Sequence, residues 1–208
     1  MMERADSSVA ELPLFQGEDG GAIPTSALQL YVDEISNTVA REFISLYHYS
    51  KTCPPCKHYY GAFFNKKLFG AAALGEPAMR HQKKCYGCDI ELRRFVLLDI
   101  APKNSESRFI SIILRMIKKL GYKKLLSLAD PEFSHVGTIY KASNFNFVGD
   151  EKGGGSRLLV VDGKPMHSRT AFAVYGTSGI RSLSKLLGEE RVSGRNKLRK
   201  KVYTFNLI

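Results

Sequence analysis

Several side chains that can donate or accept protons fall within one short stretch of the chain, residues 125–150. They are Asp130, His135, Thr138, Tyr140 and Asn144. The pattern predicts a strand at 125–128, a break at Asp130-Pro131 and a helix over about 132–143, because proline disfavours helical geometry in the residue before it. An open α/β sheet usually keeps its ligand site beyond the carboxyl end of a strand. The stretch therefore predicts a functional site, although an ordinary polar connection with one buried tyrosine explains the spacing equally well.

A second candidate group is His48-Tyr49-Ser50, which ends a helix expected from Asp33 or Ser36 to about Tyr47. An imidazole titrates near neutral pH, so His48 is a candidate general base. The alternative interpretation is a histidine that is favoured at a helix C-terminus by the helix dipole.

A third group opens the clearest helix of the chain. A strand is expected over 90–101, and its polar end at 104–107 leads into an amphipathic helix that stops at Gly121. The apolar stripe of that helix consists of Phe109, Ile112, Ile113, Met116, Ile117 and Leu120. The free amides at such a helix start form an anion site, to which Ser105 and Ser107 add hydroxyls. Plain helix capping is the alternative.

The four cysteines form two pairs, Cys53-Pro-Pro-Cys56 and Cys85-Tyr-Gly-Cys88. Two such pairs are the usual way to offer four thiolates to one structural zinc ion. A hairpin expected at 58–74 would return the second pair to the first, so we expect a small zinc-knuckle insertion at 53–88. Reduced buried thiols and dithiol redox motifs are the alternatives; a thioredoxin-like site would need its pair at the start of a helix.

The charge of the chain is large and uneven. The formal net charge is +11 over 208 residues; residues 1–20 carry five acids and one arginine, whereas residues 181–208 carry eight Lys or Arg against two Glu. A basic balance predicts a polyanionic partner, of which nucleic acid is the commonest. The residues expected to contact phosphates are Arg195, Lys197, Arg199, Lys200 and Lys201. A solvated terminal face is the alternative.

Length and composition predict one domain. We expect a flexible N-terminal lead at 1–24, a single domain at 25–208 and a flexible link at Gly153-Gly154-Gly155. No apolar run approaches the roughly 20 residues that span a bilayer, and the N-terminus lacks the apolar core of a signal peptide. These features predict a cytoplasmic protein without a membrane partner.

The order of expected elements is strand, helix, hairpin, long strand, helix, strand, helix and strand, and it resembles the GNAT acyltransferase fold. The resemblance implies an α/β fold with a mixed central sheet flanked by helices. It also implies that the turn at 102–108 holds the pyrophosphate of an acyl-CoA such as acetyl-CoA. That turn lacks the family's glycine-rich pattern Q/R-x-x-G-x-G/A, and serines stand where the glycines would be.

More specific strings resemble one GNAT-like branch, the phage Mom-type DNA-modification proteins. They are His48-Tyr49-Ser50, the segment 102–108, Ala129-Asp130, the segment from His135 to Phe145, Arg169-Thr170-Ala171 and Tyr175-Gly176-Thr177-Ser178. The resemblance implies that the chain modifies the exocyclic amine of adenine in double-stranded DNA with an acetamide-type (methylcarbamoyl) group. Such a protein would protect phage DNA from restriction in the host cytoplasm.

The same resemblance implies roles for individual residues. Tyr140 would donate a proton near the leaving sulfur, and Asp130 and His48 would deprotonate or orient the base. Tyr49 joins the catalytic set, which is His48, Tyr49, Asp130 and Tyr140. The donor-binding set is Ser105, Ser107, Arg108 and Asn144. The paired cysteines look like an addition to the family, so the zinc set, which is Cys53, Cys56, Cys85 and Cys88, is predicted from their spacing alone.

Two other functions fit the same sequence. One is a GNAT-like acyltransferase that acts on a hypermodified thymidine, a protein or a small amine. The other is a zinc-stapled DNA-binding module without enzymatic activity, which the missing glycine turn favours and the retained Asp130, His135 and Tyr140 disfavour.

Overall fold

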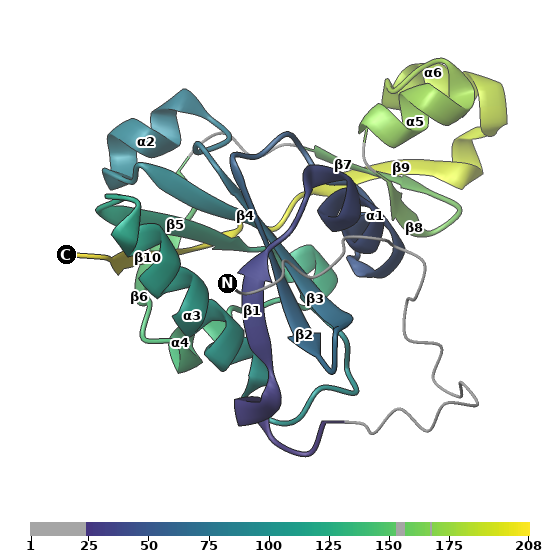
Figure 1. Ribbon diagram of the computed structural model, residues 1–208. Coiled ribbons are helices and arrows are strands. Elements are labelled where there is room, and N and C mark those ends of the chain that lie inside the picture. Colours follow the sequence, from purple (N-terminus) through teal and green to yellow (C-terminus); the bar gives the residue numbers. More distant parts are fainter. Residues whose placement is uncertain (1–23, 153–156, 167) are drawn as a thin grey trace, which may run out of the picture. The chain divides into compact units, whose positions relative to one another are not determined.

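The computed structural model describes residues 24–152, 157–166 and 168–208 (Figure 1). Most of the expected lead at 1–24, and the glycine link at 153–155, lie outside the described residues. The chain divides into two compact units. The first comprises the described residues through Ala129 together with Val136–Gly149 and Lys201–Ile208, and the second comprises Asp130–His135 and Asp150–Lys200.

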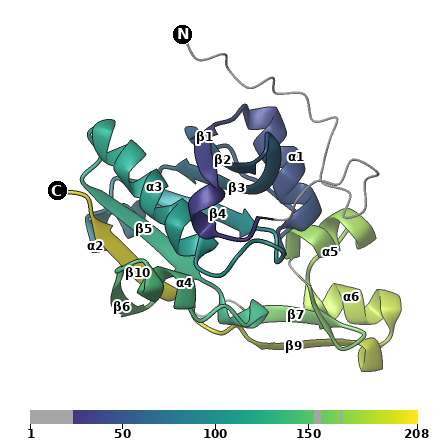
Figure 2. The same ribbon diagram turned by 60° about the horizontal axis from the view of Figure 1, so that its bottom comes forward.

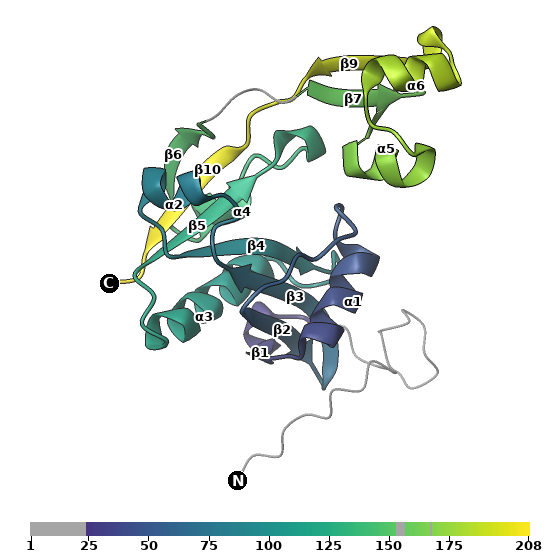
Figure 3. The same ribbon diagram turned by 90° about the horizontal axis from the view of Figure 1, so that it is seen from above.

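The first unit is built around a seven-stranded sheet with the order β1-β2-β3-β4-β5-β10-β6. Figure 3 shows β10 between β5 and β6. The pairing of β4 with β5 is parallel, whereas β1–β2, β2–β3, β3–β4 and β5–β10 are antiparallel, so the sheet is mixed. The elements are η1 (Ala27–Gln29), β1 (Tyr31–Glu34), α1 (Asn37–Tyr47), β2 (His58–Phe64), β3 (Lys67–Gly75), α2 (Arg80–Tyr86), β4 (Ile90–Leu97), α3 (Ser105–Lys119), β5 (Lys124–Ala129), α4 (Thr138–Ala142), β6 (Asn146–Asp150) and β10 (Lys201–Asn206).

Two helices cover opposite faces of this sheet (Figure 2). On β3, Ala72 and Leu74 pack into the cluster that holds the buried face of α3. That face includes most of the predicted stripe, but Ile110 and Leu114 are buried in it, whereas Leu120 is exposed. The alternate residues Ala71 and Ala73 pack into the cluster that holds Phe43 and Ile44 of α1. Successive side chains of a strand point to opposite faces, so α3 and α1 form the two outer layers. The predicted α/β fold with a mixed sheet flanked by helices is confirmed.

The local signals of the first half behave as the sequence predicts. The Ser36 hydroxyl accepts the Val39 backbone N–H at 3.3 Å and begins α1. The hairpin of β2 and β3 turns at Asn65 and Lys66, whose φ angles are 46° and 65°. Two consecutive residues with positive φ are the geometry of the tight hairpin turn that matches the twist of the strands.

The helix expected over 132–143 is divided in the structure. A short 3-10 helix, η2 (Pro131–Phe133), is separated from α4 by Gly137, which has φ of 81°. A Cβ at Gly137 would lie 2.2 Å from a ring carbon of Tyr203, and the Tyr203 hydroxyl donates to the Val136 carbonyl at 2.7 Å. The close packing of the Tyr203 ring thus requires a glycine and interrupts the helix.

The second unit has its own small sheet and core, which explains why it is compact by itself. Its strands follow the order β8-β7-β9 with antiparallel pairing, and Figure 1 shows α5 and α6 beside this sheet. The core consists of Leu159, Val161, Ala171, Leu183 and Val192. Besides η2, the elements are β7 (Arg157–Val161), β8 (Lys164–Met166), α5 (Ser168–Tyr175), α6 (Ile180–Leu187), η3 (Glu189–Arg191) and β9 (Val192–Asn196).

None of the helices within the described ranges combines the length and the apolar character that crossing a membrane would require.

Candidate functional site

The two central strands of the first unit separate at their carboxyl ends. β4 and β5 pair over only three positions, from Ile90 with Leu125 to Leu92 with Ser127. Beyond these positions β4 stays paired with β3 and β5 with β10. A β-bulge at the same place leaves Arg93 as an extra residue between the pairs Leu74–Leu92 and Ala73–Arg94. Bulges of this kind redirect side chains and are frequent beside active sites.

Tyr140, on α4, is the buried hydroxyl of this region. Its side chain packs against the rings of Phe145 and Tyr203, with centroid distances of 5.4 and 5.3 Å. Burial raises the pKa of Tyr140 to about 12; the neighbouring Ser127 hydroxyl opposes this shift, and Tyr49 and Glu91 add to it. Tyr140 therefore keeps its proton at neutral pH, and the structure brings it together with Tyr49.

His48 is held in one orientation at the end of α1. The ring is buried, and its Nδ1 accepts the Ser50 backbone N–H at 3.1 Å and lies 2.9 Å from the Ser50 hydroxyl. A backbone N–H can only donate, so the proton of the neutral ring is on Nε2. The ring of Tyr49 lies at a centroid distance of 4.2 Å. In this geometry the Nδ1 of the neutral ring is engaged by Ser50, and the ring carries its proton on Nε2. The catalytic role of His48 stays a prediction.

Glu91 is a carboxylate that the sequence reasoning did not select. It lies on β4, is 5% exposed, and its Oε2 accepts the Ala78 backbone N–H at 2.6 Å. Its charge contributes to the raised pKa of Tyr140, which places it near that hydroxyl. The signal available in the sequence was a single acid within a central, largely buried strand.

A pocket of about 730 Å³ lies at the start of α3 and brings together most of the predicted donor-binding residues. Ser107, Arg108 and Asn144 line it, whereas Ser105 is buried and does not. Lys103 and Arg115 add positive charge that the sequence reasoning had not assigned. Among the described residues, the buried Ser143 hydroxyl on the pocket wall has no hydrogen-bond partner.

The turn before α3 lacks the glycines of the acyltransferase pattern, and an asparagine adopts the left-handed conformation there. Asn104 precedes the helix with φ of 69°, a left-handed conformation that asparagine tolerates better than most residues. Its carbonyl accepts the Arg108 backbone N–H at 3.0 Å and the Ser107 hydroxyl at 3.0 Å. Asn104 thus supplies the special backbone geometry for which glycine is the usual choice.

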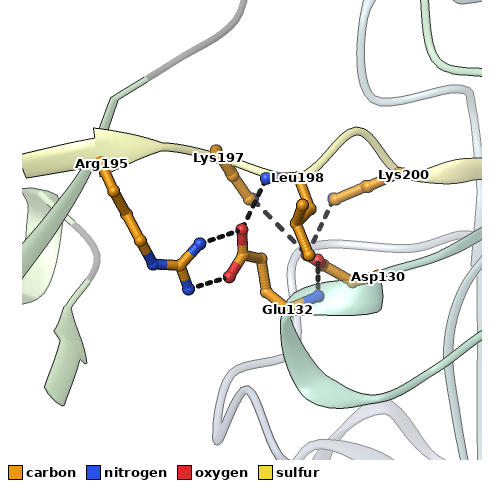
Figure 4. A network of polar contacts seen from close by, with 6 residues as sticks. All are labelled: Asp130, Glu132, Arg195, Lys197, Leu198 and Lys200. Atoms are coloured by element: carbon orange, nitrogen blue, oxygen red, sulfur yellow. Dashed lines mark hydrogen bonds and ion pairs between the residues drawn. The ribbon is translucent and has the colours of Figure 1, made fainter.

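The predicted phosphate-binding residues are largely engaged by two carboxylates within the second unit (Figure 4). The carboxylate of Glu132 accepts from the Arg195 guanidinium at 3.0 Å and from the Leu198 backbone N–H at 2.6 Å. Arg195 lowers the pKa of Glu132 through this contact. The positive charge of Arg195 is therefore offset before any external anion binds.

Asp130, predicted as a catalytic residue, belongs to the same network. Its Oδ2 lies 3.5 Å from Lys197 Nζ and 4.0 Å from Lys200 Nζ, and its Oδ1 accepts the Glu132 backbone N–H at 3.2 Å. Both carboxylate oxygens thus have structural partners. Of the five predicted phosphate contacts, Arg199 is exposed and Lys201 begins β10 in the first unit.

The predicted four-cysteine zinc site is not formed, which corrects the expected zinc-knuckle insertion. Cys53 packs beside α1, whereas Cys88 packs with Tyr86, Leu126 and Val202, and Cys85 is exposed on α2. The hairpin does bring Gly75 against Cys56, but α2 then carries the second pair elsewhere. In the part of the chain that the structure describes, no three His, Cys, Asp or Glu side chains gather closely enough to hold a metal ion.

Comparisons with known proteins agree with this picture. Residues 29–206 match the model of the Mom protein family. The methylcarbamoylase mom of Escherichia phage Mu is 30% identical over 168 residues, which cover 75% of this chain and 67% of that protein.

Two solved acetyltransferases are more distant. A Bacillus subtilis acetyltransferase in complex with CoA is 12% identical, with a TM-score of 0.46 over 86% of this chain and 99% of its own. A Drosophila melanogaster polyamine N-acetyltransferase is 7% identical, with a TM-score of 0.49 over 85% and 99%. The family match and the identity to the Mu protein confirm the resemblance seen in the sequence: the chain belongs to the Mom protein family.

Proposed function

We propose that this protein transfers an acyl-type group from an acyl-CoA thioester to the exocyclic amine of adenine in double-stranded DNA. The observation that carries the proposal is the buried Tyr140 hydroxyl, which lies on the helix whose C-terminal end lines the cationic pocket at the start of α3. Membership of the Mom family supports DNA as the acceptor.

The pocket suits the phosphates of a coenzyme A donor. Lys103, Arg108 and Arg115 supply positive charge, and the dipole of the 15-residue helix favours anions at its start. A volume of about 730 Å³ lies within the range of ordinary cofactor sites.

The chemistry follows from the protonation state of Tyr140. The adenine nitrogen attacks the thioester carbonyl, the carbon–sulfur bond breaks, and the nitrogen loses a proton as the sulfur gains one. The pKa of about 12 at Tyr140 exceeds that of an ordinary thiol, roughly 8.5, so complete proton transfer to the departing sulfur is uphill. Tyr140 therefore acts as a hydrogen-bond donor that stabilises the charge developing on sulfur.

The transferred group is proposed to be of the methylcarbamoyl type, after the name of the Mu relative. A methylcarbamoyl group contains an amide nitrogen that acetyl-CoA does not carry. A product with this group requires a nitrogen-bearing donor or a second nitrogen source, whereas a plain acetyl product requires neither. The mass of the modified nucleoside distinguishes the two.

An exocyclic amine inside a duplex is inaccessible, so we expect the base to be flipped out at a cost of a few kcal/mol. Positively charged side chains would hold the flanking phosphates, with Arg199 the exposed candidate in the basic segment. The modified base would protect phage DNA from restriction in the host cytoplasm.

The proposal is tested by expressing the protein in bacteria and digesting plasmid DNA to nucleosides for mass spectrometry, beside an empty-vector control. We expect one new adenine-derived nucleoside and resistance of the plasmid to endonucleases whose sites contain that adenine. Unchanged nucleosides in cells that express the folded protein would contradict the proposal. A modified thymidine would contradict the choice of adenine and favour the hypermodified-base alternative.

A further inference from the structure

The loop between α1 and β2 holds two thiols side by side. Cys53 and Cys56 belong to the same packed cluster beside α1, on either side of Pro54-Pro55, and the Cys53 thiol donates to the Pro54 carbonyl at 3.5 Å. The Cys56 backbone N–H donates to the Tyr59 hydroxyl at 2.9 Å, and the Cys56 backbone lies close to Gly75, where an added Cβ would be 3.3 Å from the Cys56 Cα. Two prolines with fixed φ and these contacts keep the pair together.

Positive charge surrounds this pair. The β-bulge at Arg93 allows two consecutive arginines of β4 to reach the same loop. Arg94 Nε donates to the Thr52 carbonyl at 2.7 Å, and Arg93 donates to the Pro55 carbonyl at 3.4 Å. Arg41 of α1 lines a pocket of about 460 Å³ beside Cys53. The sequence argued against a dithiol site because neither pair begins a helix; here guanidinium groups supply the positive charge instead.

The two thiols differ in acidity. The hydrogen bond from Cys56 and the nearby arginines lower the pKa of Cys53 to about 7, although burial opposes the shift. The same hydrogen bond, together with burial, raises the pKa of Cys56. At neutral pH a substantial fraction of Cys53 is therefore thiolate, whereas Cys56 keeps its proton.

We propose that Cys53 and Cys56 form a thiol–disulfide redox pair, in which Cys53 attacks a low-molecular-weight disulfide such as oxidised glutathione and Cys56 resolves the mixed disulfide. In the first step the Cys53 sulfur bonds to one glutathione sulfur and the other leaves as thiolate. In the second step the Cys56 thiol loses its proton and displaces the remaining glutathione. The two cysteines lose two electrons and two protons in total, and oxidised glutathione becomes two reduced molecules.

The pocket beside Cys53 fits this class of substrate. Arg41 and Lys51 on its wall are suitable partners for the carboxylates of glutathione, and Cys53 itself forms part of the lining. The pocket lies in the first unit, apart from the residues that line the pocket at the start of α3.

Cys85 and Cys88 provide an internal comparison, because they have the same spacing without the same surroundings. Burial raises the pKa of Cys88 to about 11, and Cys85 is exposed on α2. An ordinary thiol is about 3% ionised at neutral pH, and a thiol with a pKa of 11 is ionised far less. Allowing for the lower nucleophilicity of a less basic thiolate, we expect Cys53 to react on the order of a hundredfold faster than Cys88.

Hydrogen bonds connect the loop that holds Cys53 to His48. The Thr52 carbonyl accepts both from Arg94 and from the Ser50 hydroxyl, which in turn lies beside His48 Nδ1. Formation of a Cys53–Cys56 disulfide changes the backbone next to Thr52 and thereby the support of His48. The expected loss of acyl transfer on oxidation rests on the proposed function; the redox chemistry of the pair does not.

The test treats the reduced, purified full chain with oxidised glutathione, quenches samples at a series of times with an alkylating reagent and digests them with trypsin. Cleavage after Lys51 and Lys57 yields a peptide with Cys53 and Cys56, and cleavage after Lys84 and Arg93 yields one with Cys85 and Cys88. We expect the 52–57 peptide to lose two hydrogens at reaction times that leave the 85–93 peptide alkylated. C56S should accumulate the mixed disulfide with glutathione at Cys53, and C85S should oxidise as the wild type does.

Equal oxidation of the two peptides would overturn the proposal, as would a 52–57 peptide that stays fully alkylated in oxidised glutathione. Bound zinc that is lost together in C53S and C85S would also overturn it, because four thiolates would then share a metal. A pair that oxidises selectively in a protein without acyl transfer in either redox state supports this inference and contradicts the proposed function, so the two failures are distinguishable.

Discussion

At the residue scale, the burial of Tyr140 determines its protonation state. Its ring is fixed by Phe145 and Tyr203, and its hydroxyl is removed from water, so the same packing that orients the side chain also keeps it protonated. A tyrosine in this state stabilises a developing negative charge by donating a hydrogen bond. Removal of the Tyr140 hydroxyl should therefore slow the chemical step.

Replacing Tyr140 with phenylalanine should reduce turnover by about a hundredfold or more and leave the affinity for coenzyme A unchanged. The reason is that the ring and its packing remain while the hydrogen bond to the sulfur is lost. Single-turnover rates and calorimetric titration with coenzyme A measure the two quantities. The matched control is Y31F, in which an exposed tyrosine that stacks on Phe63 loses its hydroxyl.

The pH dependence adds a second observable. An ordinary tyrosine ionises near pH 10, whereas burial raises the pKa of Tyr140 to about 12. The protonated form is the donor, so the part of the rate that depends on Tyr140 should stay constant through pH 10 and fall only as the pH approaches 12. A wild-type rate that falls around pH 10 while Y140F shows no such fall would show that Tyr140 is not buried in the working enzyme.

At the element scale, Gly137 positions Tyr140. It combines a positive φ with the close approach of the Tyr203 ring, and α4 begins directly after it. The element is short, five residues, so it depends on this packing rather than on its own helical propensity.

Replacing Gly137 with alanine should lower the free energy of unfolding by roughly 1–3 kcal/mol from backbone strain, plus the cost of displacing the Tyr203 ring. Thermal or urea unfolding measures this loss. G121A is the matched control, because Gly121 has a similar φ of 87° with nothing within 4 Å of an added Cβ. Equal destabilisation by the two substitutions would contradict the role of the Tyr203 ring.

Periodicity and turn chemistry were sufficient to predict the elements that depend on local signals. The apolar stripe and Gly121 predicted α3, Ser36 predicted the start of α1, and Asn65-Lys66 predicted the hairpin of β2 and β3. Elements that depend on distant contacts were missed. The division between η2 and α4 requires the Tyr203 ring, which comes from the far end of the chain. β9 was not predicted, because the charges of its segment indicated a solvated or phosphate-binding face.

The candidate site was predicted in part for the same reason. The segment around Tyr140 and the residues at the start of α3 are each continuous in the sequence. Their local spacing was therefore enough to predict which residues lie together at the pocket. The roles of Asp130 and Arg195 depended on which charges would face one another, and spacing in the sequence does not contain that information. The cysteine pairs looked alike in sequence and differ in their burial and in the arginines of β4 that lie near one of them.

At the scale of the whole molecule, the charge pattern is less simple than the net charge of +11 suggests. Three of the five cations assigned to phosphate contacts face Asp130 or Glu132 within the second unit. These ion pairs reduce the number of cations that are available to DNA. The paired side chains still reach the surface, since about half of the Arg195 side chain remains exposed. DNA phosphates would therefore compete with the two carboxylates for the same side chains.

The most direct test of the central claim uses the purified protein, plasmid DNA, a protein-free bacterial extract that supplies the second nitrogen source, and acetyl-CoA that carries an isotopic label in the acetyl carbons. After the reaction, the DNA is digested and its nucleosides are separated by mass. The account predicts labelled carbon in one adenine-derived nucleoside with the wild-type protein and a loss of about a hundredfold or more with Y140F. Label that remains in coenzyme A, or that appears in thymidine or in the protein instead, would contradict acyl transfer to adenine.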